Sequence, residues 1–170
     1  MLRKYFNEKE YDNLVESDNL LYKALEIVSK LFKDKVDKGG IPYSVHLLRV
    51  YDGVSDYNEK VTALLHDTLE DTDVSVSDLE EVGIPKEITD VLVLLTKNKG
   101  EDYGSYIARI INGHNIHALN IKLADLTHNM EVGRIKNPTI NDYERINKRY
   151  APARERILEE INNFEIDRRK

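Results

Sequence analysis

The amino-acid sequence predicts an all-α protein, a single bundle of roughly seven to nine helices. Apolar residues recur three and four positions apart through most of the chain, which is the spacing of a helix that buries one face. Pro, Gly, Ser and Asp stand where these periodic stretches begin and end. No segment alternates polar and apolar residues as a half-buried strand does, and no internal repeat or low-complexity linker interrupts the pattern.

Two helices are expected in the first third of the chain. Ser17 or Asp18 should cap the first, and Gly39-Gly40 should stop it. Its apolar face consists of Leu21, Ala24, Leu25, Val28, Leu31 and Phe32. Pro42 opens the second helix, Tyr43 to Asp52, because the amide that proline lacks has no partner in the first turn of a helix. Gly53 should end it.

Three further helices are expected before the middle of the chain. Ser55 or Asp56 should cap a helix that continues to Thr72 or Asp73, with Val61, Leu64, Leu65 and Leu69 on its apolar face. A short helix near 77–82 stops at Gly83, and Pro85 starts the next, whose buried face is Ile88, Val91, Leu92 and Leu95. Residues 91–95 also fit a buried strand, but their capped, periodic flanks favour a helix.

The second half continues in the same way. Residues 96–101 indicate a loop, followed by a helix from Tyr103 to about Ile111 and a break at Gly113. A helix from 118 to 130 has Leu119, Leu123, Leu126 and Met130 as its apolar stripe. Beyond Asn137-Pro138, a last long helix is marked by Ile146, Tyr150, Ala153, Ile157, Ile161 and Phe164. Pro152 should kink or divide it.

Length and composition indicate one globular domain over residues 1–170. The formal net charge of −6 argues against nucleic acid as a partner, because such binding depends on broad basic surface, but it permits a small nucleotide. The chain has no cysteine, which excludes disulfides, zinc-cysteine sites and thiol catalysis. No signal peptide or membrane-spanning run is present, so we expect no membrane partner and a cytoplasmic location, with the oligomeric state open.

Ionisable residues interrupt the apolar pattern of the helix after Ser55. His66 and Glu70 are four positions apart, as are Asp67 and Asp71, so all four side chains can reach one neighbourhood. Other helices supply further polar groups, namely His46, Asp125 and Asn129. Two imidazoles and two carboxylates (His46, His66, Asp67 and Asp125) form a candidate site for manganese, iron, magnesium or zinc. Glu70 and Asp71 are then placed to orient or deprotonate a water, which is the equipment of a hydrolase.

Each of these residues also has a structural interpretation when taken alone. A single histidine on an amphipathic helix is more often structural than a metal ligand, and Asp125 has Lys122 three positions before it as a possible ion-pair partner. Glu70 and Asp71 fit the solvated end of a helix. We interpret His114, His117 and His128 as structural or orienting groups. The metal hypothesis gains over these alternatives because it accounts for all four ligands together.

Three motifs resemble one branch of the HD-domain phosphohydrolases. The order His46, His66-Asp67, Asp125 matches the H…HD…D pattern of that family. The strings GGIPYSVH (39–46), LLHDTLEDT (64–72) and KLADLTHNM (122–130) are similar to the hydrolase domains of the bifunctional Rel/Spo alarmone enzymes and their small stand-alone relatives. The resemblance extends from about Leu21 to about Ile157, nearly the whole chain.

This resemblance implies an α-helical HD domain that holds one divalent ion, usually Mn²⁺, and removes the 3′-pyrophosphate from ppGpp or pppGpp to give GDP or GTP. By position, the ligands would be His46, His66, Asp67 and Asp125. Glu70 and Asp71 would activate the attacking water, and Asn129 would contact the ribose. Lys99 and Arg145 approximately match phosphate-contact positions, and Lys97 and Arg149 are further basic candidates.

The chain departs from the family at Asp37-Lys38, where relatives tend to have Arg-Lys. The arginine that would stack on guanine is absent, and aspartate cannot replace a stacking cation. Lys38 remains as a phosphate contact, whereas Leu126 follows Asp125 where the family often has a basic residue. Two alternatives therefore stay open: an HD phosphohydrolase acting on NADPH 2′-phosphate, a deoxynucleotide monophosphate or another phosphoester, and a catalytically silent nucleotide-sensing module.

Overall fold

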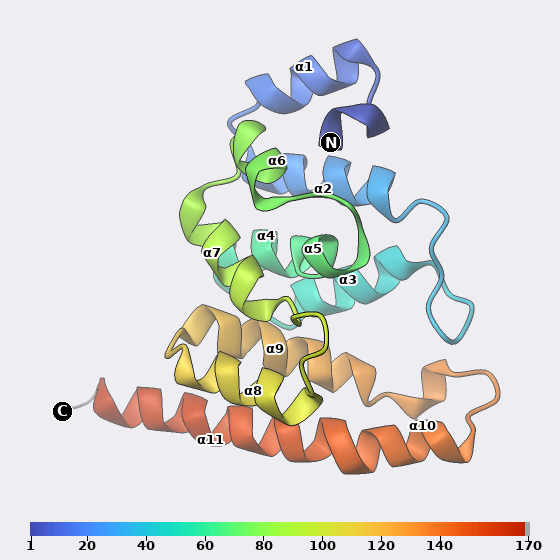
Figure 1. The fold of residues 1–170 in the computed structure, drawn as a ribbon, viewed down its shortest axis with the longest axis vertical. Coiled ribbons are helices and arrows are strands. Elements are labelled where there is room, and N and C mark those ends of the chain that lie inside the picture. Colours follow the sequence, from blue (N-terminus) through green and yellow to red (C-terminus); the bar gives the residue numbers. More distant parts are fainter. Residues whose placement is uncertain (169–170) are drawn as a thin grey trace.

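The computed structural model describes residues 1–168, and every named element in that part of the chain is helical (Figure 1). This confirms the all-α prediction. The longer helices are α1 (Glu8–Glu16), α2 (Leu20–Leu31), α3 (Tyr43–Asp52), α4 (Tyr57–Leu65), α7 (Lys86–Leu95), α8 (Tyr103–Asn112), α9 (Ile116–Asn129) and α11 (Ala151–Asp167). The shorter ones are η1 (Leu2–Tyr5), α5 (Thr68–Asp71), α6 (Val76–Glu81), η2 (Val132–Arg134), α10 (Ile140–Arg145) and the π-helical turn η3 (Ile146–Tyr150).

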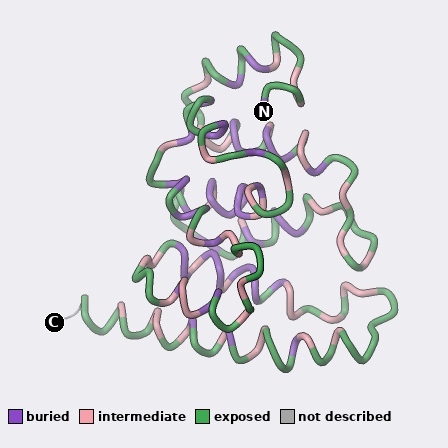
Figure 2. The backbone as a smooth tube through the Cα atoms, in the orientation of Figure 1, coloured by how far each residue is buried: buried purple, intermediate pink, exposed green. Residues whose placement is uncertain are grey.

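Two apolar clusters hold the helices together. The first packs α1, α2 and α6 against one side of α3, α4 and α7. The second packs α8, α9 and α11 against the other side of the same three helices. Figure 2 shows that the buried residues lie in the interior of the bundle, on this middle layer and on the faces of α2 and α9 that pack against it. Polar side chains carried on α3 and on the end of α4 therefore lie at the junction of the two clusters.

Proline, glycine and aspartate mark several helix ends as predicted. Pro42 precedes α3 and Gly53 follows it, and the side chain of Asp56 accepts the Asn58 and Glu59 amides at the start of α4. Pro85 precedes α7 as predicted. Residues 91–95 belong to this helix, so the strand alternative for them is wrong. No helix in the described part of the chain combines the length and apolar character that a membrane crossing requires.

The N-terminal part differs from the prediction in two ways. A capping box between Asn7 and Glu10 starts α1, a helix that the apolar pattern did not reveal. The cap of α2 is Asn19, whose side chain accepts the Tyr22 amide at 3.0 Å, and not Ser17 or Asp18.

The predicted stop of this helix at Gly39-Gly40 is also wrong, because α2 ends at Leu31. The following loop is organised by Asp37, whose Oδ1 accepts the amides of Gly39 at 2.8 Å and Ile41 at 3.0 Å. These side-chain bonds give the backbone an alternative to helical pairing. Gly40 has φ +79°, a conformation that favours glycine.

The predicted helix from Asp56 to Thr72 or Asp73 is divided. Helix α4 ends at Leu65, and α5 starts at Thr68 and ends at Asp71, which leaves His66 and Asp67 in the joint. The ring Nδ1 of His66 bonds to the carbonyl of Ala63 at 2.7 Å, so a side chain takes up a carbonyl at the end of α4. The apolar spacing continues through this joint, which is why periodicity did not detect it.

The last helical stretch is divided near Pro152, as predicted. Helix α10 leads into the π-helical turn η3, in which the Ala151 amide bonds to the carbonyl of Ile146, five positions back. Pro152 then occupies the first turn of α11, where its missing amide leaves no helical bond unmade. Figure 1 shows α10 and α11 following one another along one side of the molecule, beneath α8 and α9.

Candidate functional site

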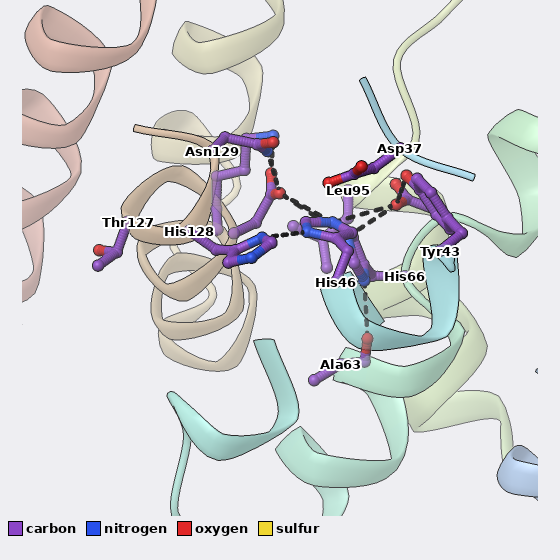
Figure 3. Close-up of polar contacts among 12 residues, drawn as sticks. Asp37, Tyr43, His46, Ala63, His66, Leu95, Thr127, His128 and Asn129 are labelled. Atoms are coloured by element: carbon purple, nitrogen blue, oxygen red, sulfur yellow. Dashed lines mark hydrogen bonds and ion pairs between the residues drawn. The ribbon is translucent and has the colours of Figure 1, made fainter. Parts of the chain in front are cut away.

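The four predicted metal-ligand residues converge at the junction of the two clusters, where Figure 3 shows His46 beside His66. Nε2 of His46 lies 3.3 Å from Nε2 of His66, 3.5 Å from Oδ2 of Asp67 and 3.4 Å from Oδ1 of Asp125. Nε2 of His66 is 3.1 Å from the same Asp67 oxygen and 3.9 Å from that of Asp125. Two nitrogens and two oxygens thus surround one point, and His46, His66 and Asp125 are buried.

Three elements bring these donors together. His46 lies on α3, and Asp125 faces it from α9. His66 and Asp67 occupy the joint between α4 and α5, where consecutive side chains reach the same point, as they would not do along a regular helix. The break in the helix therefore permits the adjacent His-Asp pair to act as one unit.

Hydrogen bonds orient both imidazoles. His66 donates from Nδ1 to the carbonyl of Ala63, which directs its Nε2 at the cluster. Nδ1 of His46 lies 2.7 Å from Nδ1 of His128, and Figure 3 shows His128 pointing at His46 while its neighbour Thr127 points away. We interpreted His128 as structural or orienting, and its place one turn after Asp125 on α9 is the sequence signal for that contact.

The carboxylates are held ionised by their surroundings. Burial raises the pKa of Asp67, but His66 and His46 outweigh it and hold that pKa well below its usual range. The pKa of Asp125 is also lowered, because Lys122 and the two histidines outweigh its burial. For His66, burial lowers the pKa, and Asp67 and Asp125 raise it to about 9. The surroundings of the cluster therefore keep the carboxylates of Asp67 and Asp125 negatively charged.

Neighbouring side chains hold the two carboxylates in position. The hydroxyl of Tyr43 donates to Oδ2 of Asp67 at 2.5 Å. Lys122, a buried lysine, donates to Oδ2 of Asp125 at 2.8 Å, and Asn129 donates to Oδ1 of the same residue at 2.5 Å. Burial lowers the pKa of Lys122, but the charge of Asp125 outweighs this effect and raises it well above its usual value.

Two adjoining cavities open onto the cluster. The inner cavity, about 430 Å³, is lined by His66, Asp67, Glu70, Lys97 and Lys122 among others. The outer cavity, about 310 Å³, is lined by the loop 35–38 and by residues from the end of α9 to η3. Six residues line both: Lys38, Tyr43, His46, Asp71, Asn129 and Tyr150. A single elongated ligand can therefore extend from one cavity into the other.

The predicted water-activating pair lies in the inner cavity. Oε2 of Glu70 accepts the amide of Lys97 at 3.1 Å. The walls of the cavity partly enclose Glu70 and raise its pKa, and the charges of Asp67 and Asp71 act in the same direction against the Lys97 amide. Asp71 forms an ion pair with Lys35 and lies 3.5 Å from the Tyr43 hydroxyl.

The predicted substrate contacts are distributed unevenly. Lys38, Asn129 and Arg145 line the outer cavity. Lys99 is exposed on its loop and lines neither of the two cavities, whereas Lys97 lines the inner one, because the Lys97 amide is tied to Glu70. Arg149 lines a separate, smaller surface hollow, which Arg145 also lines.

Sequence reasoning missed two cations in the outer cavity, Lys35 and Arg134. Nη1 of Arg134 donates to Oδ2 of Asp37 at 2.6 Å, and its Nη2 donates to Oδ1 of Asn129 at 3.1 Å. Arg134 lies on the short helix η2, whose position no motif predicts. An acid at position 37 was the available signal, because a mostly buried carboxylate requires a cationic or amide partner.

Several known proteins are similar to this chain over part of their length. A guanosine-3′,5′-bis(diphosphate) 3′-pyrophosphohydrolase of Borreliella burgdorferi is 29% identical over 153 residues, which cover 81% of this chain and 23% of that protein. A probable enzyme of the same name from Mycoplasma pneumoniae is 36% identical over 86 residues, 48% of this chain and 12% of that protein. A probable GTP pyrophosphokinase of Mycobacterium leprae is 30% identical over 132 residues, 71% of this chain and 16% of that protein.

A solved structure has the same fold. A metazoan ortholog of SpoT that hydrolyzes ppGpp matches with a TM-score of 0.69 at 22% identity, over 85% of this chain and 86% of that one. No family model matches the chain. The chain spans less than a quarter of the length of the curated relatives it matches.

Proposed function

We propose that this chain, a relative of the HD-domain alarmone hydrolases, removes the 3′-pyrophosphate from guanosine 3′,5′-bis(diphosphate), ppGpp, and its pppGpp analogue. The observation that carries the proposal is the convergence of His46, His66, Asp67 and Asp125 beside a cavity that contains two further carboxylates. We treat residues 1–170 as one HD hydrolase domain, because the two apolar clusters share α3, α4 and α7.

The donor set fits a divalent cation. Two imidazole nitrogens and two ionised carboxylate oxygens form a mixed site without sulfur, which suits Mn²⁺, the ion that we propose. The set is open on the side of the inner cavity, where a substrate and a water can approach. A divalent ion held by His46, His66, Asp67 and Asp125 would polarise the phosphoryl group and acidify a water.

The remaining residues supply proton transfer and charge. We assign Glu70 as the group that accepts the proton of the attacking water, since its raised pKa brings it closer to the range of an effective general base. Asp71, linked to Lys35 and Tyr43, helps to orient that water. Lys97 and Lys122 line the same cavity and offset the charge of the leaving pyrophosphate.

One assay tests the proposal against its alternatives. The Mn²⁺-reconstituted protein is incubated with ppGpp, NADPH and deoxynucleotide monophosphates, and pyrophosphate is distinguished from orthophosphate. We expect pyrophosphate from ppGpp. Orthophosphate from NADPH or a deoxynucleotide would instead identify a different phosphoester as substrate. No turnover of any of these, with metal bound, would overturn the hydrolase proposal and favour a nucleotide-sensing module.

A further inference from the structure

The outer cavity collects more positive charge than its acidic residues neutralise. Lys38, Arg134 and Arg145 all line it. Arg134 is paired with Asp37, and Arg145 is paired with Asp142. Within residues 1–168, Lys38 has no carboxylate within ion-pair distance. Partial burial lowers the pKa of Lys38, and the charges of Arg145 and Arg134 act in the same direction against that of Asp142.

Arg134 is held rigidly at this position. Asp37 and Asn129 each accept one hydrogen bond from its guanidinium, at 2.6 and 3.1 Å, and its side chain is only 16% exposed. A guanidinium clamped on two sides loses little conformational entropy when it binds an anion. Its free Nη protons stay available, because each Nη atom carries two and uses one.

Asp37 is an unsuitable contact for the substrate itself. Its Oδ1 already accepts two backbone amides, its Oδ2 accepts from Arg134, and its side chain is only 8% exposed. A carboxylate with these three partners has little capacity left to accept a hydrogen bond from a nucleotide base. Its effect is to position Arg134.

We propose that Arg134, together with Lys38 and Arg145, binds a second phosphate or diphosphate group of the substrate, one that is not hydrolysed. Cations that converge without enough carboxylates are suited to a multiply charged anion, and arginine binds phosphate through paired hydrogen bonds. This inference rests on the proposed function, because it places the hydrolysed group at the candidate metal cluster and the second group in the outer cavity. It selects nucleotides that carry two separate phosphate groups, and it disfavours a nucleoside monophosphate.

Binding of two probes tests this role without hydrolysis. GDP carries a 5′-diphosphate, and guanosine carries none. The Kd of each is measured by titration calorimetry with the Mn²⁺-loaded wild-type protein and with Arg134→Gln. We expect Arg134→Gln to raise the Kd of GDP about tenfold and to leave that of guanosine unchanged.

Two further variants make the result decisive. Lys136→Gln removes an exposed cation two positions away that lines none of the described cavities, and it should leave both Kd values unchanged. The double variant Asp37→Asn, Arg134→Gln avoids an unpaired carboxylate if the single variant folds poorly, and it should show the same loss for GDP.

An equal weakening of GDP and guanosine would assign Arg134 to the nucleoside and overturn the inference. Unchanged GDP binding would also overturn it. Neither result depends on turnover, so pyrophosphate release from ppGpp by the wild type would still support the proposed function. Conversely, the wild-type protein could bind GDP more tightly than guanosine in a way that depends on Arg134, and yet hydrolyse no ppGpp. That result would refute the proposed function and leave this inference standing.

Discussion

Asp37 and Arg134 lie 97 positions apart in the chain and meet at 2.6 Å, Oδ2 to Nη1. The pair joins the loop after α2 to the helix η2 after α9, at the rim of the outer cavity. Both side chains are mostly buried. Their contact therefore couples the shape of the candidate substrate site to the stability of the fold.

Replacing Asp37 by Asn should make stability less dependent on acid. Asn keeps an oxygen for the Gly39 and Ile41 amides but loses the charge that faces Arg134. At pH 7 we expect a loss of about 3 kcal/mol in the free energy of unfolding, because a buried charge is left unpaired. Burial raises the pKa of Asp37, but the Ile41 amide and Arg134 outweigh it and lower that pKa.

The sign of the pH effect follows from this depressed pKa. The contribution of Asp37 is complete above the unfolded pKa of about 3.9 and disappears as the pH falls through the folded value. Urea unfolding in steps from pH 7 to pH 2 should therefore show the two proteins converging below about pH 4. Asp34→Asn, at an exposed position of the same loop, serves as the control. A constant difference at all pH values would contradict this account.

Substitutions of Asp125 and of Glu70 should affect metal binding and catalysis differently. Asp125→Ala removes a proposed ligand and should lose metal and activity together. Glu70→Ala should retain the metal while pyrophosphate release slows about 10² to 10⁴-fold, the usual contribution of a general base. Metal content by elemental analysis and release rates are measured on the same samples. A Glu70→Ala protein with the parent rate would remove Glu70 from the mechanism.

His128 should affect metal affinity without being a ligand. Its contact with Nδ1 of His46 orients that ring, so His128→Ala is expected to weaken Mn²⁺ binding about 10 to 100-fold. Equilibrium dialysis against Mn²⁺ measures the change. His117→Ala, which removes a histidine paired with Glu59 and outside both cavities, is the matched control. Equal affinities for the two variants would show that the contact is incidental.

Lys122 should stabilise the protein most when no metal is bound. Lys122→Met leaves Asp125 without its cationic partner, so we expect a loss of about 3 kcal/mol in unfolding free energy without metal. A divalent ion at the cluster supplies the missing positive charge, and the loss should then shrink. Thermal melts with and without Mn²⁺ compare the variant with the wild type. A loss that stayed the same in both conditions would indicate that Lys122 acts through packing alone.

Local signals in the sequence predicted much of this structure. Pro42 and Gly53 bound α3, and Asp56 caps α4, because prolines, glycines and caps act within a few residues. The candidate ligands could also be predicted, since four acids and histidines had to find partners once their helices were buried. Their roles as metal ligands, and those of Glu70 and Asp71, stay predictions.

What the sequence did not reveal depends on distant contacts. The joint at His66 and Asp67 preserves the apolar period, so no local pattern distinguishes it from a continuous helix. Lys97 and not Lys99 lines the inner cavity because its amide meets Glu70 on another element. Arg134 acquires its position from Asp37, and no spacing rule links two residues so far apart.

The π-helical turn between α10 and α11 has a consequence for the shape of the candidate substrate site. Arg145 and Tyr150 both line the outer cavity, although residues five apart in an α-helix point about 140° away from each other. The turn joins residues five apart by its hydrogen bonds and so brings both side chains to one wall. The π-helical turn just before Pro152 contains one more residue than an α-helical turn, and it thus determines which side chains a ligand in the outer cavity would contact. Insertions and deletions in this short stretch would rotate one half of a helix against the other and so change the wall of the candidate substrate site, with the candidate metal ligands left in place.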